Sequence, residues 1–215
     1  MDIILGATHG LGEQLARQLK SQGREIFSVG RSYDESKHGA GIAIDLLLSN
    51  EVDELCRKID ELDVSAFYWV AGYRYSGDFA DQQNPLRMAQ VNFANALPVA
   101  QVAWQKMSVT ENSNLVVVSS TSGTKARANE AIYAATKYAQ VGFARSLGLE
   151  AERLKLSVKV SLFMPGGMKT PFWGETLPEN YESYLDPARV AAEIIKDTKS
   201  QASAYHERTI ERGGL

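Results

Sequence analysis

The most constraining feature of this sequence is a regular alternation of short apolar runs with longer amphipathic segments. The segments between the runs repeat apolar residues at helical spacing, as Leu11, Leu15 and Leu19 do. The apolar runs predict strands at residues 3–5, 25–29, 41–44, 65–71, 115–119, 157–163 and 205–210. The amphipathic segments predict helices at residues 10–21, 51–62, 85–107, 131–153 and 187–199.

Strands that are apolar along their whole length are typical of a parallel sheet that is buried on both faces. When such strands alternate with helices, the pattern indicates the α/β class. We therefore expect one domain over residues 1–215, with a doubly wound parallel sheet of about seven strands and helices on both faces. Residues 168–186 form the one long irregular segment, whose length is typical of a functional lid or of disorder.

The composition excludes several classes of protein. The chain has 215 residues, 44% apolar and 23% charged, which suits one soluble domain. Its net charge is −3 and its lysines and arginines are scattered, so we expect no nucleic-acid partner. No apolar stretch can cross a bilayer, the N-terminus lacks a signal-peptide pattern, and no cysteine–histidine set has zinc spacing. With a single cysteine, Cys56, these features predict a cytoplasmic protein without a membrane partner, an internal disulfide or a metal site.

A glycine-rich turn, Gly6-Ala-Thr-His-Gly-Leu-Gly12, joins the first predicted strand to the first predicted helix. Glycine permits positive backbone angles and a close approach to a phosphate. The start of the helix adds free N–H groups and a partial positive charge. This placement predicts a nucleotide phosphate site, although a tight turn without a ligand would use the same residues.

The residue after the second strand bears on the choice of nucleotide. Nucleotide-binding folds of this kind place an acidic residue near this point for a ribose 2′-hydroxyl, or an arginine for a 2′-phosphate. Here the residue is Arg31, whereas Asp34 and Glu35 lie three and four residues further on. The guanidinium matches the geometry of a phosphate, and His9 could add a donor. We therefore predict that NADP(H) is preferred over NAD(H); the alternative is a solvated loop charge.

Tyr133 and Lys137 place a phenol and an ammonium four residues apart on one face of a predicted helix. The spacing alone is weak evidence, because Tyr33 and Lys37 repeat it in a polar stretch that we interpret as a loop. Context separates the two pairs. Ser120 ends the clearest strand thirteen residues before Tyr133, and the carboxyl ends of parallel strands are where open sheets build their sites.

In this order the motifs resemble the short-chain dehydrogenase/reductase family, which has a single NAD(P)-binding Rossmann domain. The glycine turn, Ala71-Gly72 and the segment Pro165-Gly-Gly-Met-Lys-Thr170 match family motifs. Asn92, Ser120, Tyr133 and Lys137 match the catalytic tetrad of the family. The resemblance implies cofactor contacts from Gly6, Thr8, His9, Gly10, Leu11, Gly12, Arg31, Asp45, Leu46, Ala71, Gly72, Tyr133, Lys137, Pro165, Gly166, Met168 and Thr170.

The resemblance also implies the reaction, hydride transfer between NADP(H) and a carbonyl or alcohol substrate. Lys137 would hold the nicotinamide ribose and, with the oxidised nicotinamide, lower the pKa of Tyr133 from its usual value of about 10. Ser120 would donate a hydrogen bond to the substrate oxygen, and Tyr133 would exchange a proton with it. Asn92 would hold a water that links Lys137 to solvent.

Two positions depart from the family pattern. Leu5 stands where the family has threonine, and Val70 stands where it has asparagine. We expect the two positions to lie on adjacent strands, with an apolar contact in place of a polar one. The irregular segment 168–186 would act as the lid. Seven aromatic residues could line an apolar or aromatic substrate pocket: Tyr73, Tyr75, Phe163, Phe172, Trp173, Tyr181 and Tyr184.

The family commonly dimerises through two long helices, here residues 85–107 and 131–153. We therefore expect a homodimer or homotetramer, with close helix packing at Ala96, Ala100, Ala134, Ala135 and Gly142; packing of these residues on the chain's own sheet is the alternative.

Two other functions compete with the carbonyl–alcohol oxidoreductase. One is a non-catalytic protein that senses NADPH, which the intact tetrad disfavours. The other is a Rossmann-like methyltransferase, which has no need of Tyr133 and Lys137.

Overall fold

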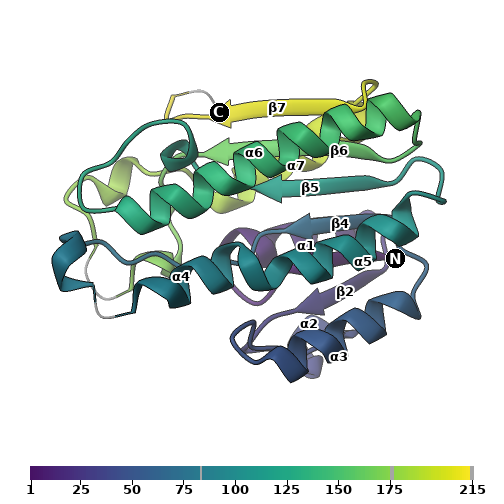
Figure 1. The fold of residues 1–215 in the computed structure, drawn as a ribbon, viewed down its shortest axis with the longest axis horizontal. Coiled ribbons are helices and arrows are strands. Elements are labelled where there is room, and N and C mark those ends of the chain that lie inside the picture. Colours follow the sequence, from purple (N-terminus) through teal and green to yellow (C-terminus); the bar gives the residue numbers. More distant parts are fainter. Residues whose placement is uncertain (83, 175–176, 214–215) are drawn as a thin grey trace.

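Seven parallel strands form one sheet in the middle of the molecule, in the order β3-β2-β1-β4-β5-β6-β7 (Figure 1). The computed structural model describes residues 1–82, 84–174 and 177–213. Every neighbouring pair of strands is parallel, which confirms the predicted fold class. The strands are β1 (Asp2–Leu5), β2 (Ile26–Val29), β3 (Gly41–Ile42), β4 (Ala66–Trp69), β5 (Asn114–Val118), β6 (Lys159–Pro165) and β7 (Tyr205–Ile210).

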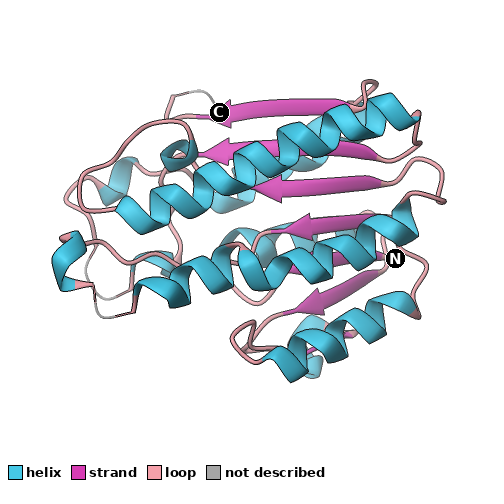
Figure 2. Ribbon diagram, viewed as in Figure 1, coloured by secondary structure: helices cyan, strands magenta, loops and turns pink. Residues whose placement is uncertain are grey.

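Helices cover both faces of the sheet and divide the core into two clusters (Figure 2). One face packs against α3 (Ser49–Asp60), α5 (Leu97–Met107) and α6 (Ala131–Leu154), with α4 (Pro85–Asn92) in the same layer. The other face packs against α1 (Gly10–Ser21) and α7 (Pro187–Ser200). No helix in the described part of the chain is long and apolar enough to span a membrane.

The chain reverses its direction of travel across the sheet between β1 and β4, which are hydrogen-bonded neighbours. From β1 the chain moves outward to β2 and β3, and it returns to start β4 on the other side of β1. The loops that follow β1 and β4 therefore part to opposite faces of the sheet. Such a reversal opens a crevice at the carboxyl ends of the strands, where ligands bind in doubly wound folds.

The helix predicted over residues 85–107 is wrong as one continuous element. α4 ends at Asn92, Phe93 leaves the helical region with φ −141° and ψ −65°, and a 3₁₀ turn over Ala94–Ala96 precedes α5. Pro98 lies in the first turn of α5, where its missing N–H leaves no bond unmade. The break removes the usual helical partner of the Asn92 carbonyl, because Ala96 donates its N–H to Phe93 instead.

Two predictions beside β2 are also corrected. The polar stretch at Tyr33 to Lys37, predicted as loop, overlaps the one-turn helix α2 (Glu35–His38), which the Asp34 carboxylate caps through the Ser36 N–H. The strand predicted over residues 41–44 pairs with β2 only at Gly41 and Ile42. Asp45 therefore lies in the loop that follows β3. The other predicted elements are present, with ends shifted by at most two residues.

Leu5 ends β1 and Val70 directly follows the neighbouring strand β4, so the two positions are neighbours as predicted. The apolar contact predicted between their side chains is absent, because the side chains lie on opposite faces of the sheet. The Val70 N–H donates to the Leu5 carbonyl at 2.9 Å, so the two backbones are paired. The Leu5 side chain is buried in the core cluster beneath α3, α5 and α6, whereas Val70 packs against the cluster beneath α1 and α7. Successive residues of a strand point to opposite faces, and Leu5 is in register with Trp69 rather than with Val70.

This separation predicts that the two positions act independently on stability. Leu5→Thr should lower the free energy of unfolding by about 2 kcal/mol, because it removes buried methyl groups and buries a hydroxyl. Val70→Asn should cost less, because its side chain is only half-buried. Urea unfolding of both single variants and of the double variant should give additivity within about 0.5 kcal/mol. A coupling above about 1 kcal/mol would show that the two side chains interact.

Candidate active site

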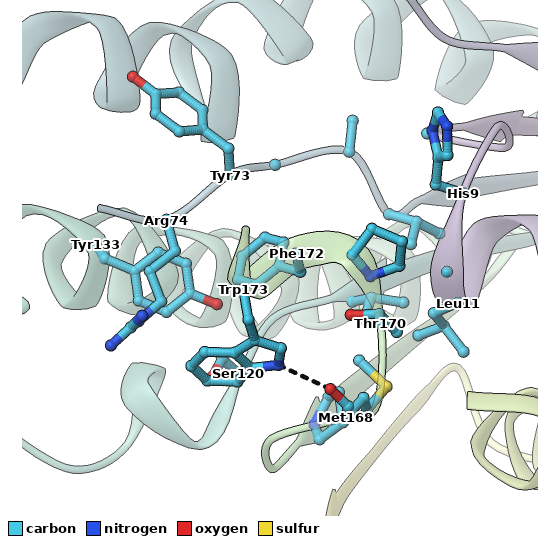
Figure 3. A pocket seen from close by; sticks show the side chains of 18 of the residues that line it. His9, Leu11, Tyr73, Arg74, Ser120, Tyr133, Met168, Thr170, Phe172 and Trp173 are labelled. Carbon is cyan, nitrogen blue, oxygen red and sulfur yellow. Dashed lines mark hydrogen bonds between the residues drawn. The ribbon is translucent and has the colours of Figure 1, made fainter. Parts of the chain in front are cut away.

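A cleft of about 910 Å³ runs along the carboxyl ends of β1, β4, β5 and β6. This volume lies at the upper end of the range of roughly 300–1,000 Å³ found for small-molecule and cofactor sites. His9 and Leu11 lie toward one end of the cleft, and Ser120, Tyr133 and Arg74 lie toward the other (Figure 3). Every residue predicted to contact the cofactor or to act in catalysis lines this cleft, apart from Gly12 and Asn92.

The glycine turn sits at the start of α1, and its backbone leaves no room for a side chain at Gly6 or at Gly12. Gly6 and Gly10 have positive φ angles of +97° and +57°, which favour glycine. A Cβ on Gly6 would lie 2.6 Å from the Ala71 nitrogen, and one on Gly12 would lie 1.9 Å from the Gly6 carbonyl oxygen. Gly12 therefore supports the turn from behind rather than lining the cleft. The turn brings the N-terminus of α1 to the cleft wall, and its first N–H groups have no partner within the helix.

The charges that line the cleft are mainly positive. Its acidic residues are Asp45 and Glu130, and its basic residues are Arg31, Arg74, Arg87, Arg127, Lys137 and Arg212. Arg31 is exposed where the chain leaves β2. The nearby Asp34 is not part of the lining, because its carboxylate caps α2 and pairs with Lys37 at 3.4 Å. Asp45 does line the cleft, and its carboxylate accepts from the Leu47 N–H at 3.0 Å.

Ser120 and Tyr133 meet at the end of the cleft that Arg74 occupies (Figure 3). Ser120 follows β5 and caps a 3₁₀ turn, with its hydroxyl oxygen accepting from the Ser122 N–H at 3.1 Å. Tyr133 lies in the first turn of α6 and is buried. Burial raises the pKa of the Tyr133 phenol to about 12; the Ser120 hydroxyl opposes this rise, while the Glu130 carboxylate adds to it. The phenol is therefore neutral at ordinary pH, and Lys137 without the oxidised nicotinamide does not produce the lowered Tyr133 pKa that was predicted for the two together.

Lys137 lies one turn after Tyr133 on α6 and is also buried. Its Nζ donates to the Val118 carbonyl at 3.2 Å and to Gln140 Oε1 at 2.9 Å. The Nζ atom lies 5.8 Å from the centroid of the Tyr133 ring. Burial lowers the pKa of the Lys137 ammonium to about 7, because a charged group loses solvation in this environment. The ammonium therefore exchanges its proton close to neutral pH.

Asn92 lies behind the cleft and holds the loop that follows β4. Its Oδ1 accepts from the Tyr73 N–H at 2.8 Å, and its Nδ2 donates to the Tyr73 carbonyl at 2.9 Å. The same Nδ2 donates to the Thr136 hydroxyl at 3.1 Å. The amide is fully buried and bonded on both sides, so it fixes the β4–α4 loop against α6. The role expected for Asn92, as the holder of a water, stays a prediction.

An ion pair that the sequence reading missed joins three loops around Tyr133. Arg74 donates to Glu130 Oε1 through two nitrogens at 2.9 and 2.7 Å, and the Ser122 hydroxyl donates to Glu130 Oε2 at 3.0 Å. The Arg74 guanidinium also lies 4.7 Å from the centroid of the Trp173 ring. Arg74 comes two residues after the Ala71-Gly72 motif, and Glu130 comes three residues before Tyr133. Proximity to these motifs is the only signal in the sequence that could have found them.

The segment 168–186 forms part of one wall of the cleft, residues 175–176 lying outside the described residues. Its two ends are tied by a parallel bridge between Met168 and Leu185. The Phe172 ring lies 6.0 Å from the Tyr133 ring, and the Trp173 indole donates to the Met168 carbonyl at 2.7 Å (Figure 3). Of the seven aromatic residues predicted to line a pocket, four do so: Tyr73, Phe172, Trp173 and Tyr184.

The other three aromatic residues are placed elsewhere, so the prediction was wrong for them. Phe163 is fully buried in the core cluster beneath α1 and α7, because it lies inside β6 with its side chain on that face. Tyr75 is 48% exposed, and neither it nor Tyr181 belongs to the cleft lining. The aromatic wall is therefore concentrated near Tyr133, at the end of the cleft opposite the glycine turn.

The residues present fit a nicotinamide dinucleotide. The cleft is long and mainly cationic, which suits a ligand with several phosphates. The N-terminus of α1 and the close packing at Gly6 provide a phosphate cradle. The Ser120, Tyr133 and Lys137 side chains gather at the far end, where the reactive part of such a ligand would lie. When bound, the cofactor would supply or accept a hydride.

Comparisons with known proteins agree with this site. The model of the short chain dehydrogenase family matches residues 2–180. An uncharacterized oxidoreductase of Staphylococcus aureus is 28% identical over 208 residues, which cover 90% of this chain and 88% of that protein. An alcohol dehydrogenase from the archaeon Thermococcus sibiricus, complexed with 5-hydroxy-NADP, superposes with a TM-score of 0.85 at 21% identity, covering 100% of this chain and 97% of that one. A 4-hydroxyisoleucine dehydrogenase complexed with NADH gives 0.82 at 18% identity, with coverage of 100% and 97%.

The family match extends from β1 through the glycine turn, the β5 serine and the α6 tyrosine–lysine pair to the segment that follows β6. The chain therefore belongs to the short-chain dehydrogenase/reductase family.

Proposed function

We propose that this protein is an NADP(H)-dependent oxidoreductase that interconverts a carbonyl and an alcohol. The observation that carries the proposal is the meeting of Ser120, Tyr133 and Lys137 at one end of a cationic cleft. The three groups come from the end of β5 and from one face of α6, as the family pattern requires. The family membership and the oxidoreductase names of the relatives support the same reaction class.

In carbonyl reduction, the substrate oxygen gains negative charge as the hydride arrives. The Ser120 hydroxyl donates a hydrogen bond to this oxygen and stabilises the charge. The Tyr133 phenol, which burial holds in its neutral form, transfers its proton to the same oxygen. The Lys137 ammonium stabilises the phenolate that remains and returns the proton needed for the next turnover. In alcohol oxidation the same groups act in reverse.

Support for NADP(H) over NAD(H) comes from the region after β2. Arg31 is exposed on the cleft wall, and its planar guanidinium can pair with a 2′-phosphate through two bonds. An acidic residue here would repel that phosphate. The nearest one, Asp34, is turned into the cap of α2 and is not part of the lining. The solved relatives named above carry a form of NADP in one case and NADH in the other, so the assignment to this chain rests on Arg31.

The aromatic wall supports an apolar or aromatic substrate. Phe172 and Trp173 lie beside Tyr133, where the carbon skeleton next to the reacting carbonyl would pack. Segment 168–186 would then serve as the lid.

We place this chemistry in the cytoplasm and in a homodimer or homotetramer. Of the five small residues expected at a helix interface, Ala96 and Ala100 pack against the chain's own sheet and Ala134 is buried, whereas Ala135 and Gly142 are exposed on α6.

The first test removes the proton donor. Tyr133→Phe deletes one oxygen atom and should lower kcat for NADPH-dependent reduction of aromatic ketones and diketones at least about 100-fold, the usual size of general acid catalysis. Dissociation of NADPH, followed by nicotinamide fluorescence, should change little. Tyr138→Phe is the matched control, because Tyr138 lies on the same helix but is 46% exposed. Equal turnover by wild type and Tyr133→Phe would refute the mechanism.

A second test concerns the 2′-phosphate. Arg31→Ala should weaken NADPH binding about 10- to 100-fold, because a charge-assisted bond to the phosphate is lost. NADH binding should change less than about twofold, since NADH lacks that phosphate. Arg57→Ala, an exposed arginine on α3 outside the cleft lining, controls for the loss of net charge. Isothermal titration should be run at fixed salt; tighter binding of NADH than of NADPH by the wild type would overturn the assignment.

A further inference from the structure

Gln140 connects the buried lysine to the break between α4 and α5. It lies one turn beyond Lys137 on α6 and has no exposed surface. Its Oε1 accepts from Lys137 Nζ at 2.9 Å, and its Nε2 donates to the Asn92 carbonyl at 2.9 Å. The side chain therefore spans the distance between Lys137 and Asn92, the residue expected from the family pattern to hold a water that links Lys137 to solvent.

The chemistry of its neighbours fixes the orientation of this amide. A lysine ammonium can only donate hydrogen bonds, and a backbone carbonyl can only accept them. A flipped amide would place donor against donor at Lys137 and acceptor against acceptor at Asn92. The amide oxygen must therefore face Lys137, where it favours the charged form of the lysine.

The Asn92 carbonyl is available to Gln140 because the helix stops there. α4 ends at Asn92, and Ala96, four residues later, donates its N–H to Phe93. A continuous helix over residues 85–107 would have used the Asn92 carbonyl for its own ladder. The break and the glutamine thus form a matched pair, one exposing an acceptor and the other supplying its donor.

Few other groups act on the Lys137 charge. On its own helix the titratable neighbour is Tyr133, and its ring centroid is 5.8 Å away. The groups that face it from β5, from α4 and from the β4–α4 loop are the Val118 carbonyl, Asn92 and Gly72, none of which titrates. Within the described residues no carboxylate forms an ion pair with Lys137. Val118 and Gln140 are the two acceptors that offset its burial.

We propose that Gln140 is a positioning residue that holds the Lys137 ammonium in place and fills the path between Lys137 and Asn92. This inference rests on the proposed function, because it assigns Gln140 a part in the same proton chemistry. A primary amide has no proton to release near neutral pH, so the proton of Lys137 exchanges on the cleft side. Loss of the amide oxygen destabilises the charged lysine and weakens its support of the Tyr133 phenolate.

The test compares two substitutions of Gln140 that should shift the Lys137 pKa in opposite directions. Gln140→Met keeps the length and shape of the side chain but removes both hydrogen bonds. Gln140→Glu places a carboxylate beside the ammonium. Lysines labelled with ¹³C at Cε are titrated by NMR without any substrate, and the Lys137 signal is assigned by its loss in Lys137→Arg. The Lys137 pKa should fall by about one pH unit in Gln140→Met and rise by at least about one in Gln140→Glu.

Opposite shifts distinguish positioning from a general loss of packing, which would move both variants in the same direction. Gln105→Met, at an exposed position on α5, is the matched control and should leave the Lys137 titration unchanged. A Lys137 pKa that stays within about 0.3 of the wild-type value in folded Gln140→Met would overturn the proposal. If that variant does not fold, the absence of a rise in Gln140→Glu overturns it equally.

The kinetic arm uses NADPH with an aromatic diketone as the probe. The pH profile of kcat for Gln140→Met should shift in the direction of its Lys137 titration, with KM for NADPH changed less than about threefold. If the Lys137 pKa shifts in Gln140→Met but the pH profile of kcat does not, Gln140 has no effect on catalysis and that part of the proposal is wrong. If the wild type reduces no carbonyl, the proposed function fails, while the NMR titration still reports whether Gln140 controls Lys137.

Discussion

The parallel pairing of β1 with β4 and of β4 with β5 is the constraint on which the site depends. Because the three strands run in one direction and in matched register, the glycine turn, the Ala71-Gly72 turn and Ser120 all emerge at one edge. The backbone bonds from Val70 and Ala71 to the Leu5 carbonyl hold the first two turns within contact distance. A Cβ at Gly6 would collide with Ala71, so glycine there is a condition of the strand pairing as well as of phosphate approach.

Much of the fold could be predicted from the sequence, because its signals are local. The apolar runs lie wholly inside the sheet, and β5 shows why they were recognisable: all five of its residues are buried. The amphipathic helices α1 and α3 bury the apolar residues that marked their periodicity. Many residues that line the cleft directly follow the ends of strands, so the predicted strand ends also indicated much of the cleft lining.

The remaining features depend on contacts between residues far apart in the chain. Pro98 is a signal that a helix starts near Leu97, but no proline or glycine marks the end of α4 at Asn92, and the Asn92 carbonyl finds its partner on α6. The Arg74–Glu130 pair joins residues 56 positions apart. Leu5 and Val70 are both apolar, so residue type alone does not show that their side chains lie on opposite faces of the sheet. That placement follows from the register of β1 with β4, in which Leu5 is paired with Trp69. Phe163 and Phe172 are the same type of residue, but Phe163 is buried in the core whereas Phe172 lines the cleft.

The Arg74–Glu130 pair couples segment 168–186 to the chemistry of Tyr133. Arg74 touches the lid through Trp173, and both members of the pair act on the proton affinity of Tyr133, Glu130 by raising it and Arg74 by lowering it. A substitution in segment 168–186 that moves Trp173 away from Arg74 would therefore also change the proton affinity of Tyr133.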